Sequence, residues 1–172
     1  MADESTHSFA AASNSQVATT TLLVSVVLIG VAAVFFLLAW QRRDQPVVKY
    51  ALGGVAVLQL ALVGLSTNFK IRGYDVSPGR LVVRHGWSRL TFPMNNFTAA
   101  RIEGNPFHGA IRRGGVGGVW SFYGRFSSPQ LGEFHAYVSD PQRAVVIQFT
   151  DQVVLVSPEE PDAFLAALLK SK

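Results

Sequence analysis

Two long apolar runs dominate the first part of the chain. Residues 17–40 and residues 50–69 contain no charged side chain, and each run is long enough to cross the hydrocarbon core of a bilayer, which takes about 20 helical residues. The segment between them carries Arg42, Arg43, Asp44 and Lys49. Because both runs exceed the usual length of a buried core helix, the pattern predicts a transmembrane helical hairpin over residues 17–69.

The residues before the first run are small and polar, with Asp3 and Glu4 near the start. They show no periodic pattern, so residues 1–16 are expected to form a disordered tail. A secretory signal peptide has a basic start and a shorter apolar core. Here the start is acidic and the run continues to Trp40, so the first helix is expected to remain as an anchor.

From residue 69 onwards the apolar pattern changes to a period of two. Short alternating segments are separated by turn signals such as Ser77, Pro78 and Gly79. They predict seven or eight antiparallel strands within residues 70–172, arranged as a barrel or a sandwich. Residues 104–132 interrupt the alternation and are expected to form a long glycine-rich loop.

One helix is predicted at the end of the chain. Ser157 followed by Pro158, with Glu160 three positions after the serine, is the pattern of a capping box with proline at the first helical position. An apolar stripe at helical spacing comes next and predicts a helix that closes the open end of the strands: Phe164, Leu165, Leu168 and Leu169.

Several short motifs accompany this order of elements: Arg113 to Gly117, Tyr123 to Phe126, Tyr137 to Asp140, Val145 to Ile147, and Val156 to Glu159. With the two apolar helices and the closing helix, they resemble the bacterial pleckstrin-homology-domain membrane proteins, over roughly residues 69–169. The resemblance implies a PH-like, seven-stranded, partly open barrel capped by one helix, in a bacterial inner or plasma membrane. It implies no agreed biochemical activity.

The charges that flank the apolar runs are nearly balanced as signals of orientation, and on balance they favour an extracytoplasmic C-terminal domain. The loop between the runs has three basic residues and one acidic residue, whereas the tail has no lysine or arginine. The positive-inside rule then places the loop in the cytoplasm and the C-terminal domain outside it. Four basic residues just past the second run favour a cytoplasmic domain instead: Lys70, Arg72, Arg80 and Arg84.

Composition excludes several kinds of chemistry. The chain has no cysteine, which excludes disulfides, thiolate metal sites and cysteine nucleophiles. Its net charge of +4 is modest for a nucleic-acid binder. The histidines, His7, His85, His108 and His135, do not have the spacing of a zinc motif. We therefore expect no catalytic site, no metal and no cofactor.

The candidate binding residues fall into two groups. The glycine-rich segment contains Trp120 together with Arg112, Arg113 and Arg125, whose planar guanidinium groups suit phosphate. The alternative is that its glycines only permit tight turns. Lys70 and Arg72 belong to a basic half, because residues 70–113 carry a net charge of +6 and residues 114–172 one of −2.

Two classes of function fit this sequence. The first is a membrane-anchored, non-enzymatic interaction or assembly module that docks a protein partner or another copy of itself. The second is a module that senses lipid headgroups or anions with its basic, membrane-proximal half. Neither involves nucleic acid.

Overall fold

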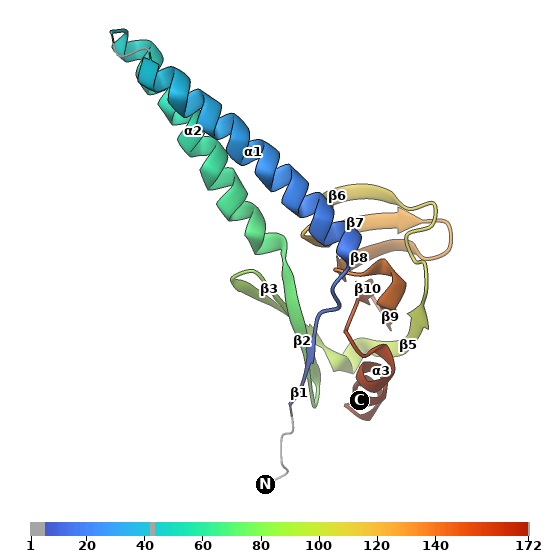
Figure 1. The fold of residues 1–172 in the computed structure, drawn as a ribbon. Helices are drawn as coiled ribbons and strands as arrows, with labels where there is room; N and C mark the ends of the chain where they lie inside the picture. The colour runs from blue at the N-terminus through green and yellow to red at the C-terminus, as the bar shows by residue number, and fades with distance from the viewer. Residues whose placement is uncertain (1–5, 42–43, 172) are drawn as a thin grey trace.

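The computed structural model describes residues 6–41 and 44–171, which form a two-helix hairpin joined to a mostly-β domain (Figure 1). The acidic residues of the predicted tail, Asp3 and Glu4, and the loop arginines, Arg42 and Arg43, lie outside the described residues. The hairpin projects from the domain, so its tip lies far from the sheets (Figure 1).

The hairpin consists of α1 (Ser15–Gln41) and α2 (Pro46–Ser66), followed by the short 3-10 helix η1 (Thr67–Phe69). The two helices meet through small side chains, and Ala32, Ala39 and Ala56 are buried between them. Pro46 begins α2 at the position where a missing N–H costs nothing. The chain thus contains the two predicted helices, both long and apolar enough to cross a membrane.

The surface of the hairpin is apolar and exposed. In the most apolar windows of the two helices only 11% and 6% of the residues are buried. A core helix of a soluble protein would bury most of such a window against its own domain. These helices instead present leucine, valine and phenylalanine outwards, which is the surface that a surrounding lipid phase requires.

The first sheet is antiparallel and has the order β1-β2-β3-β4. Its strands are β1 (His7–Ala10), β2 (Ile71–Ser77), β3 (Arg80–His85) and β4 (Ser88–Pro93). The turn signal at residues 77–79 is confirmed, because Gly79 connects β2 to β3 with a left-handed φ of 76°.

The second sheet has six strands in the order β5-β9-β10-β8-β7-β6. The short 3-10 helix η2 (Met94–Asn96) leads into it, and η3 (Pro141–Arg143) precedes β9. The strands are β5 (Phe97–Glu103), β6 (Ile111–Val119), β7 (Ser121–Ser128), β8 (Gly132–Val138), β9 (Ala144–Phe149) and β10 (Val153–Val156).

The predicted set of seven or eight antiparallel strands in residues 70–172 was incomplete. The structure has nine described strands there, and β8 pairs with β10 in parallel. The expected loop over residues 104–132 contains the hairpin β6–β7. Four of the nine residues of β6 are glycines, and the ladder to β7 has two register shifts. No alternation of side chains could therefore mark this strand in the sequence.

The predicted disordered tail was also wrong for the part that is described. β1 pairs with β2, from His7 opposite Val76 to Ala10 opposite Gly73. The next residues reach the second sheet, because the backbone N–H of Ala12 donates to the carbonyl of Ser157 at 2.9 Å. The chain before the hairpin thus bridges the two sheets, and the hairpin is an insertion between β1 and β2.

The closing helix α3 (Pro161–Lys170) begins later than predicted. Ser157 does not cap it. Its Oγ atom instead accepts from the backbone N–H groups of Ser139 at 2.9 Å and Asp140 at 3.2 Å. Pro161 supplies the proline of the first turn. Of the predicted stripe, Phe164 and Leu168 are fully buried, whereas Leu169 is exposed.

The core of the domain lies between the two sheets and under α3. Its largest fully buried side chains include Tyr74 from β2, Ile147 from β9 and Phe164 from α3. A second cluster covers the other face of the six-stranded sheet, where Phe107 packs against Phe126 and Phe134. The two clusters thus cover the central strands of this sheet on both faces, whereas Ile102 in β5 and Ile111 in β6, the two edge strands, are exposed.

Candidate functional site at the junction of hairpin and domain

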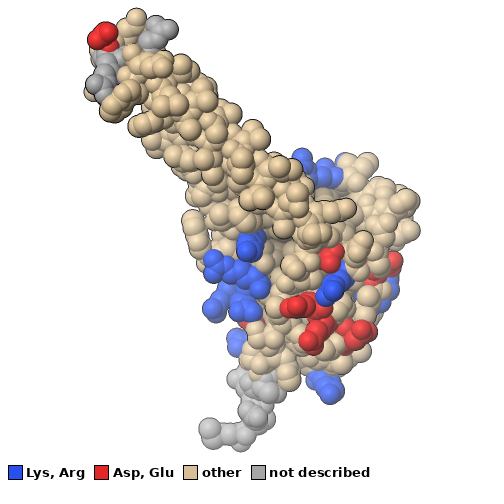
Figure 2. All heavy atoms as spheres, in the orientation of Figure 1, with Lys and Arg blue, Asp and Glu red and all other residues tan. Residues whose placement is uncertain are grey.

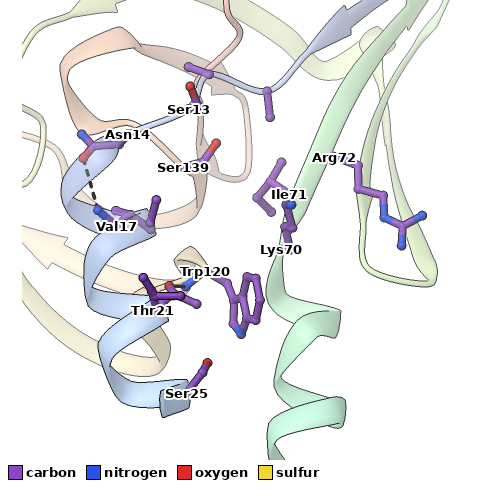
Figure 3. Close-up of a pocket in the computed structure, with 14 residues that line it drawn as sticks. Ser13, Asn14, Val17, Thr21, Ser25, Lys70, Ile71, Arg72, Trp120 and Ser139 are labelled. Atoms are coloured by element: carbon purple, nitrogen blue, oxygen red, sulfur yellow. Dashed lines mark hydrogen bonds between the residues drawn. The ribbon is translucent and has the colours of Figure 1, made fainter. Parts of the chain in front are cut away.

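Trp120 joins the domain to both helices of the hairpin. Its backbone N–H donates to Oγ1 of Thr21 in α1 at 2.8 Å, and its indole Nε1–H donates to Oγ of Ser66 at the end of α2 at 3.0 Å. The next residue, Ser121, donates from its hydroxyl to the carbonyl of Phe69 at 2.5 Å. The turn between β6 and β7 therefore lies between the ends of α1 and α2 that are nearest the domain (Figure 3).

The backbone of Trp120 is held in an unusual conformation. Its φ of 63° is the one positive value at a non-glycine residue within the described ranges, and a bulky side chain adopts this region only at a cost. The hydrogen bonds to Thr21, Ser66 and Phe69 surround this position and compensate for the strain. A strained backbone persists only where the surrounding structure holds it in place. The hydrogen bonds from two other elements therefore indicate that the fold specifically maintains this turn.

A cavity of about 890 Å³ opens beside Trp120, between α1 and the start of β2. Its walls are mainly apolar and include Val17, Leu22 and Ile71. Lys70 lies on its rim, whereas Arg72 extends away from it on the other side of the strand (Figure 3). Two of the predicted candidates, Trp120 and Lys70, therefore meet at this cavity, whereas the side chain of Arg72 points away from it.

The start of α1 is fastened to the domain by Asn14. The side-chain Oδ1 of Asn14 accepts from the backbone N–H groups of Gln16 at 2.8 Å and Val17 at 3.3 Å, as an N-cap does. Its Nδ2 donates to Oδ1 of Asp140 at 2.9 Å. One side chain thus caps the first apolar helix and ties it to the loop that follows β8.

A buried polar network lies beneath this attachment. The hydroxyl of Tyr74 donates to the carbonyl of Tyr137 at 2.7 Å and accepts from the backbone N–H of Ser157 at 3.0 Å. Complete burial raises the pKa of Tyr74 to about 12, partly offset by the hydrogen bonds around Ser157. The network holds the ends of β8 and β10 where the N-terminal segment crosses them.

The three predicted arginines do not share one surface. Arg113 and Arg125 line a depression of about 440 Å³, together with the acidic side chains Glu133 and Asp151. Arg112 does not line it and lies beside Gly117 instead. The depression therefore has mixed charge, and the expected cluster of three cationic groups is not assembled.

The charge asymmetry is visible on the surface. Basic side chains gather just below the hairpin, over β2 and β3, and acidic side chains lie mainly on the other side of the domain in this view (Figure 2). Within the described ranges, Arg84 is paired with Asp75 at 3.2 Å and donates to Ser8 of β1 at 2.9 Å. Lys70, Arg72 and Arg89 are exposed.

The histidines are dispersed through the domain, and the described residues contain no group of three or more metal-ligating side chains. His85 is buried at the end of β3, where its ring packs against Tyr123 at 5.0 Å and its Nδ1 lies 3.3 Å from the carbonyl of Asn68. The next residue, Gly86, has a left-handed φ of 45° in the turn between β3 and β4.

Sequence reasoning missed several residues of the junction. Asn14, Thr21 and Ser66 lie inside or beside apolar runs, where single polar residues carry no recognisable motif. The pairing of Asn14 with Asp140 spans 126 positions. One available signal was that small polar residues flank both runs on the side that the domain occupies.

Comparison with known proteins agrees with this architecture. The model of the family described as bacterial PH domain matches residues 72–172. No curated protein and no solved structure matches the chain. The matched segment runs from β2 to the end of α3 and covers more than half of the chain. The resemblance inferred from the sequence is confirmed: the chain belongs to the bacterial PH domain family.

Proposed function

We propose that this protein is a membrane-anchored, non-enzymatic interaction module, which presents its PH domain at the membrane surface to a protein partner or to another copy of itself. Membership of the PH family supports an interaction module for proteins or lipids. The exposed apolar surface of α1 and α2 supports insertion of the hairpin in a bilayer. The proposed role needs no cofactor and no metal.

The observation that carries the proposal is the double attachment of the hairpin. Asn14 fastens the start of α1 to Asp140, and Trp120 holds both Thr21 of α1 and Ser66 of α2. A domain on a flexible linker would sample all orientations. This domain is instead held by its own fold, so the same faces would always point away from the membrane.

Affinity purification from native membranes after chemical cross-linking tests the proposal. We expect a stoichiometric protein partner, or a cross-linked dimer of the chain, with the full chain. The matched control is a chain that ends after η1 and lacks the domain, and it should lose this product. Equal recovery with the hairpin alone, or no product with the full chain, would contradict a role for the domain in docking.

We further propose that the domain lies on the extracytoplasmic side, because the basic residues between the two apolar runs favour a cytoplasmic loop, and a two-helix hairpin leaves the domain on the opposite side. The absence of native cysteine allows a direct test. A single cysteine at the exposed residue Asn95 should react with a membrane-impermeant maleimide in intact cells. Reaction only after lysis would place the domain in the cytoplasm.

The second candidate is a module that senses lipid headgroups, and the specific observation in its favour is Lys70 on the rim of the apolar cavity. In this arrangement the acyl chain of a lipid lies against Val17 and Leu22, and the lipid phosphate binds the ammonium group of Lys70. Native mass spectrometry of the purified chain should then detect a bound anionic phospholipid, and Lys70→Gln should reduce its occupancy. Arg80→Gln, on the far end of β3, is the matched control.

A further inference from the structure

The turn between β3 and β4 carries the most exposed large apolar side chain recorded in the β domain. Trp87 is 72% exposed, compared with 64% for Ile111, 54% for Leu169 and 40% for Ile102. Tryptophan combines a large apolar ring with a polar N–H and is enriched where a membrane meets water. The position of this turn relative to the hairpin therefore decides what the side chain can reach.

The turn is clamped to the end of the second apolar helix. The backbone N–H of Trp87 donates to Oδ1 of Asn68 in η1 at 2.9 Å, and the N–H of Gly86 donates to the carbonyl of Lys70 at 2.8 Å. Gly86 has a left-handed φ of 45°, and a Cβ atom there would overlap Asn68. The close approach requires glycine, so the turn and η1 form one rigid unit.

This clamp fixes the level of Trp87 along the hairpin. The second candidate membrane span runs from Pro46 to Phe69, and Asn68, which holds the turn, is the residue before its end. The turn lies beside the lower end of α2 (Figure 1). If α2 spans a bilayer, Trp87 is therefore held where the span leaves it.

Basic side chains lie near Trp87, where the second candidate span ends. Lys70 and Arg72 follow the span directly, and Arg89 lies two positions after Trp87 in β4; all three are exposed. The basic side chains gather just below the hairpin on the side of β2 and β3 (Figure 2). An indole ring at the membrane interface, with cationic side chains around it, is complementary to anionic phospholipids, because their phosphates lie just outside the acyl chains.

We propose that the β3–β4 turn is a second membrane contact: Trp87 enters the interface of the leaflet from which α2 emerges, and Lys70, Arg72 and Arg89 bind the phosphates of anionic phospholipids. This inference rests on the proposed function, because the turn reaches a bilayer only if the hairpin lies in it. It adds a surface that sets the tilt of the domain against the membrane. The surface lies at the end of β3 and β4 opposite to the β2–β3 turn.

Spin labels at single cysteines test the contact in the full chain, which has no native cysteine. The chain is reconstituted in vesicles of phosphatidylcholine and phosphatidylglycerol, and the label reports its accessibility to oxygen and to a water-soluble nickel chelate. At the exposed residue Ser88, beside Trp87, we expect protection from nickel and high oxygen access. At Asn95, past the other end of β4, we expect full nickel access.

Two changes should move the Ser88 label towards water. Trp87→Ser in the labelled chain removes the ring and should raise nickel accessibility several-fold. Vesicles of phosphatidylcholine alone remove the anionic headgroups and should raise it to a smaller degree. An unchanged spectrum at Asn95 shows that the fold is intact in each case. A Ser88 label as accessible as the Asn95 label, or one unmoved by Trp87→Ser, would overturn the inference.

A third label separates this inference from the proposed anchoring. Leu58 lies in the middle of α2 and is 60% exposed, so a label there should contact lipid if the hairpin is inserted. Lipid contact at Leu58 with water at Ser88 overturns the β3–β4 contact and leaves the anchor intact. Water at Leu58 overturns both.

Discussion

The hairpin and the β domain treat large apolar side chains in opposite ways. Of the 25 exposed large apolar side chains recorded for the described residues, 21 lie in α1, α2 or the ends of these helices. In the domain the corresponding residues are enclosed, with Tyr74, Phe134 and Phe164 at or near zero exposure. The domain buries its large apolar side chains in its own core, whereas the described part of the hairpin leaves most of its large apolar side chains exposed.

The comparison also shows how two such different regions are joined. Hydrogen bonds hold the two regions together, and they include Asn14 with Asp140, Trp120 with Thr21 and Ser66, and Ser121 with Phe69. Each lies at the end of the hairpin nearest the domain. Hydrogen bonds fix direction and register, which apolar packing between the two regions would do less specifically.

The largest expected effect contrasts one truncation in each region. Phe164→Ala should lower the free energy of unfolding of the β domain by about 3–5 kcal/mol, because it empties the space between Phe9 and Tyr74. Leu58→Ala, at a 60% exposed position of α2, should change it by less than about 0.5 kcal/mol. Urea unfolding in lipid nanodiscs, followed by near-ultraviolet circular dichroism, measures both. Equal losses of unfolding free energy in the two variants would contradict the distinction between a buried core in the domain and an exposed apolar surface on the hairpin.

A somewhat smaller effect follows from the buried Tyr74. Burial raises its pKa to about 12 from the ordinary 10.0, so the unfolded chain loses this proton first. The stabilisation is complete below pH 10 and disappears as the pH rises towards 12, by up to about 3 kcal/mol. The pKa of Tyr137 is also raised to about 12 by burial and by Tyr123, and it acts in the same direction.

Alkaline unfolding curves of the wild type and of Tyr74→Phe measure this dependence. The variant cannot ionise at this position and should lose less stability between pH 10 and 12, although it is less stable at pH 8 through the lost hydrogen bonds. Parallel curves for the two proteins would show that Tyr74 is not protected from ionisation.

Ser157→Ala should cost about 1–3 kcal/mol, because the buried N–H groups of Ser139 and Asp140 lose their acceptor. Glu160→Ala is the matched control and should be nearly neutral, since Glu160 makes no side-chain cap bond to α3. Hydrogen exchange should accelerate at the amides of Ser139 and Asp140. Acceleration confined to the first turn of α3 would restore the helix-capping role predicted from the sequence.

The smallest expected effect concerns the joint itself. Trp120→Phe keeps an aromatic ring but replaces the indole with a smaller phenyl group, which removes the Nε1–H bond to Ser66; loss of the bond itself costs about 1 kcal/mol. A double-mutant cycle with Ser66→Ala, measured in nanodiscs, should give a coupling energy of about 1 kcal/mol between the two sites. Additive effects would mean that this bond does not connect domain and hairpin.

The elements that could be predicted from the sequence are those whose apolar pattern is local. The charge-free runs became α1 and α2, and the alternation past residue 69 became β2, β3 and β4. The stripe containing Phe164 and Leu168 became the buried face of α3. In each case the signal, a continuous apolar run or a periodic alternation of apolar and polar residues, lies in consecutive residues.

The missed elements depend on distant partners. β1 has one large apolar side chain, Phe9, and exists because β2 pairs with it and the backbone N–H of Glu159 donates to the carbonyl of Ala10. β6 is paired through backbone groups at its glycines, so it has no alternation. Ser157 fits a capping pattern, but its hydroxyl oxygen instead accepts hydrogen bonds from the buried backbone N–H groups of Ser139 and Asp140. Tertiary contacts thus override local signals.

The candidate site was predicted in part for the same reason. Lys70 and Trp120 were named from charge and from aromatic character, and the fold brings them to one cavity. Arg113 and Arg125 are adjacent, but Glu133 and Asp151 lie beside them, and these acids come from β8 and the turn before β10. A sequence scan of the glycine-rich segment alone could not include such neighbours.

The central claim is that the hairpin is an integral membrane anchor for the PH domain, and alkaline carbonate extraction of native membranes tests it most directly. Carbonate releases proteins that bind a membrane through charge or through other proteins, but it leaves inserted helices in place. We predict that the full chain stays in the membrane pellet and is released only by detergent. Release of the chain into the carbonate supernatant, with the domain folded, would contradict the claim.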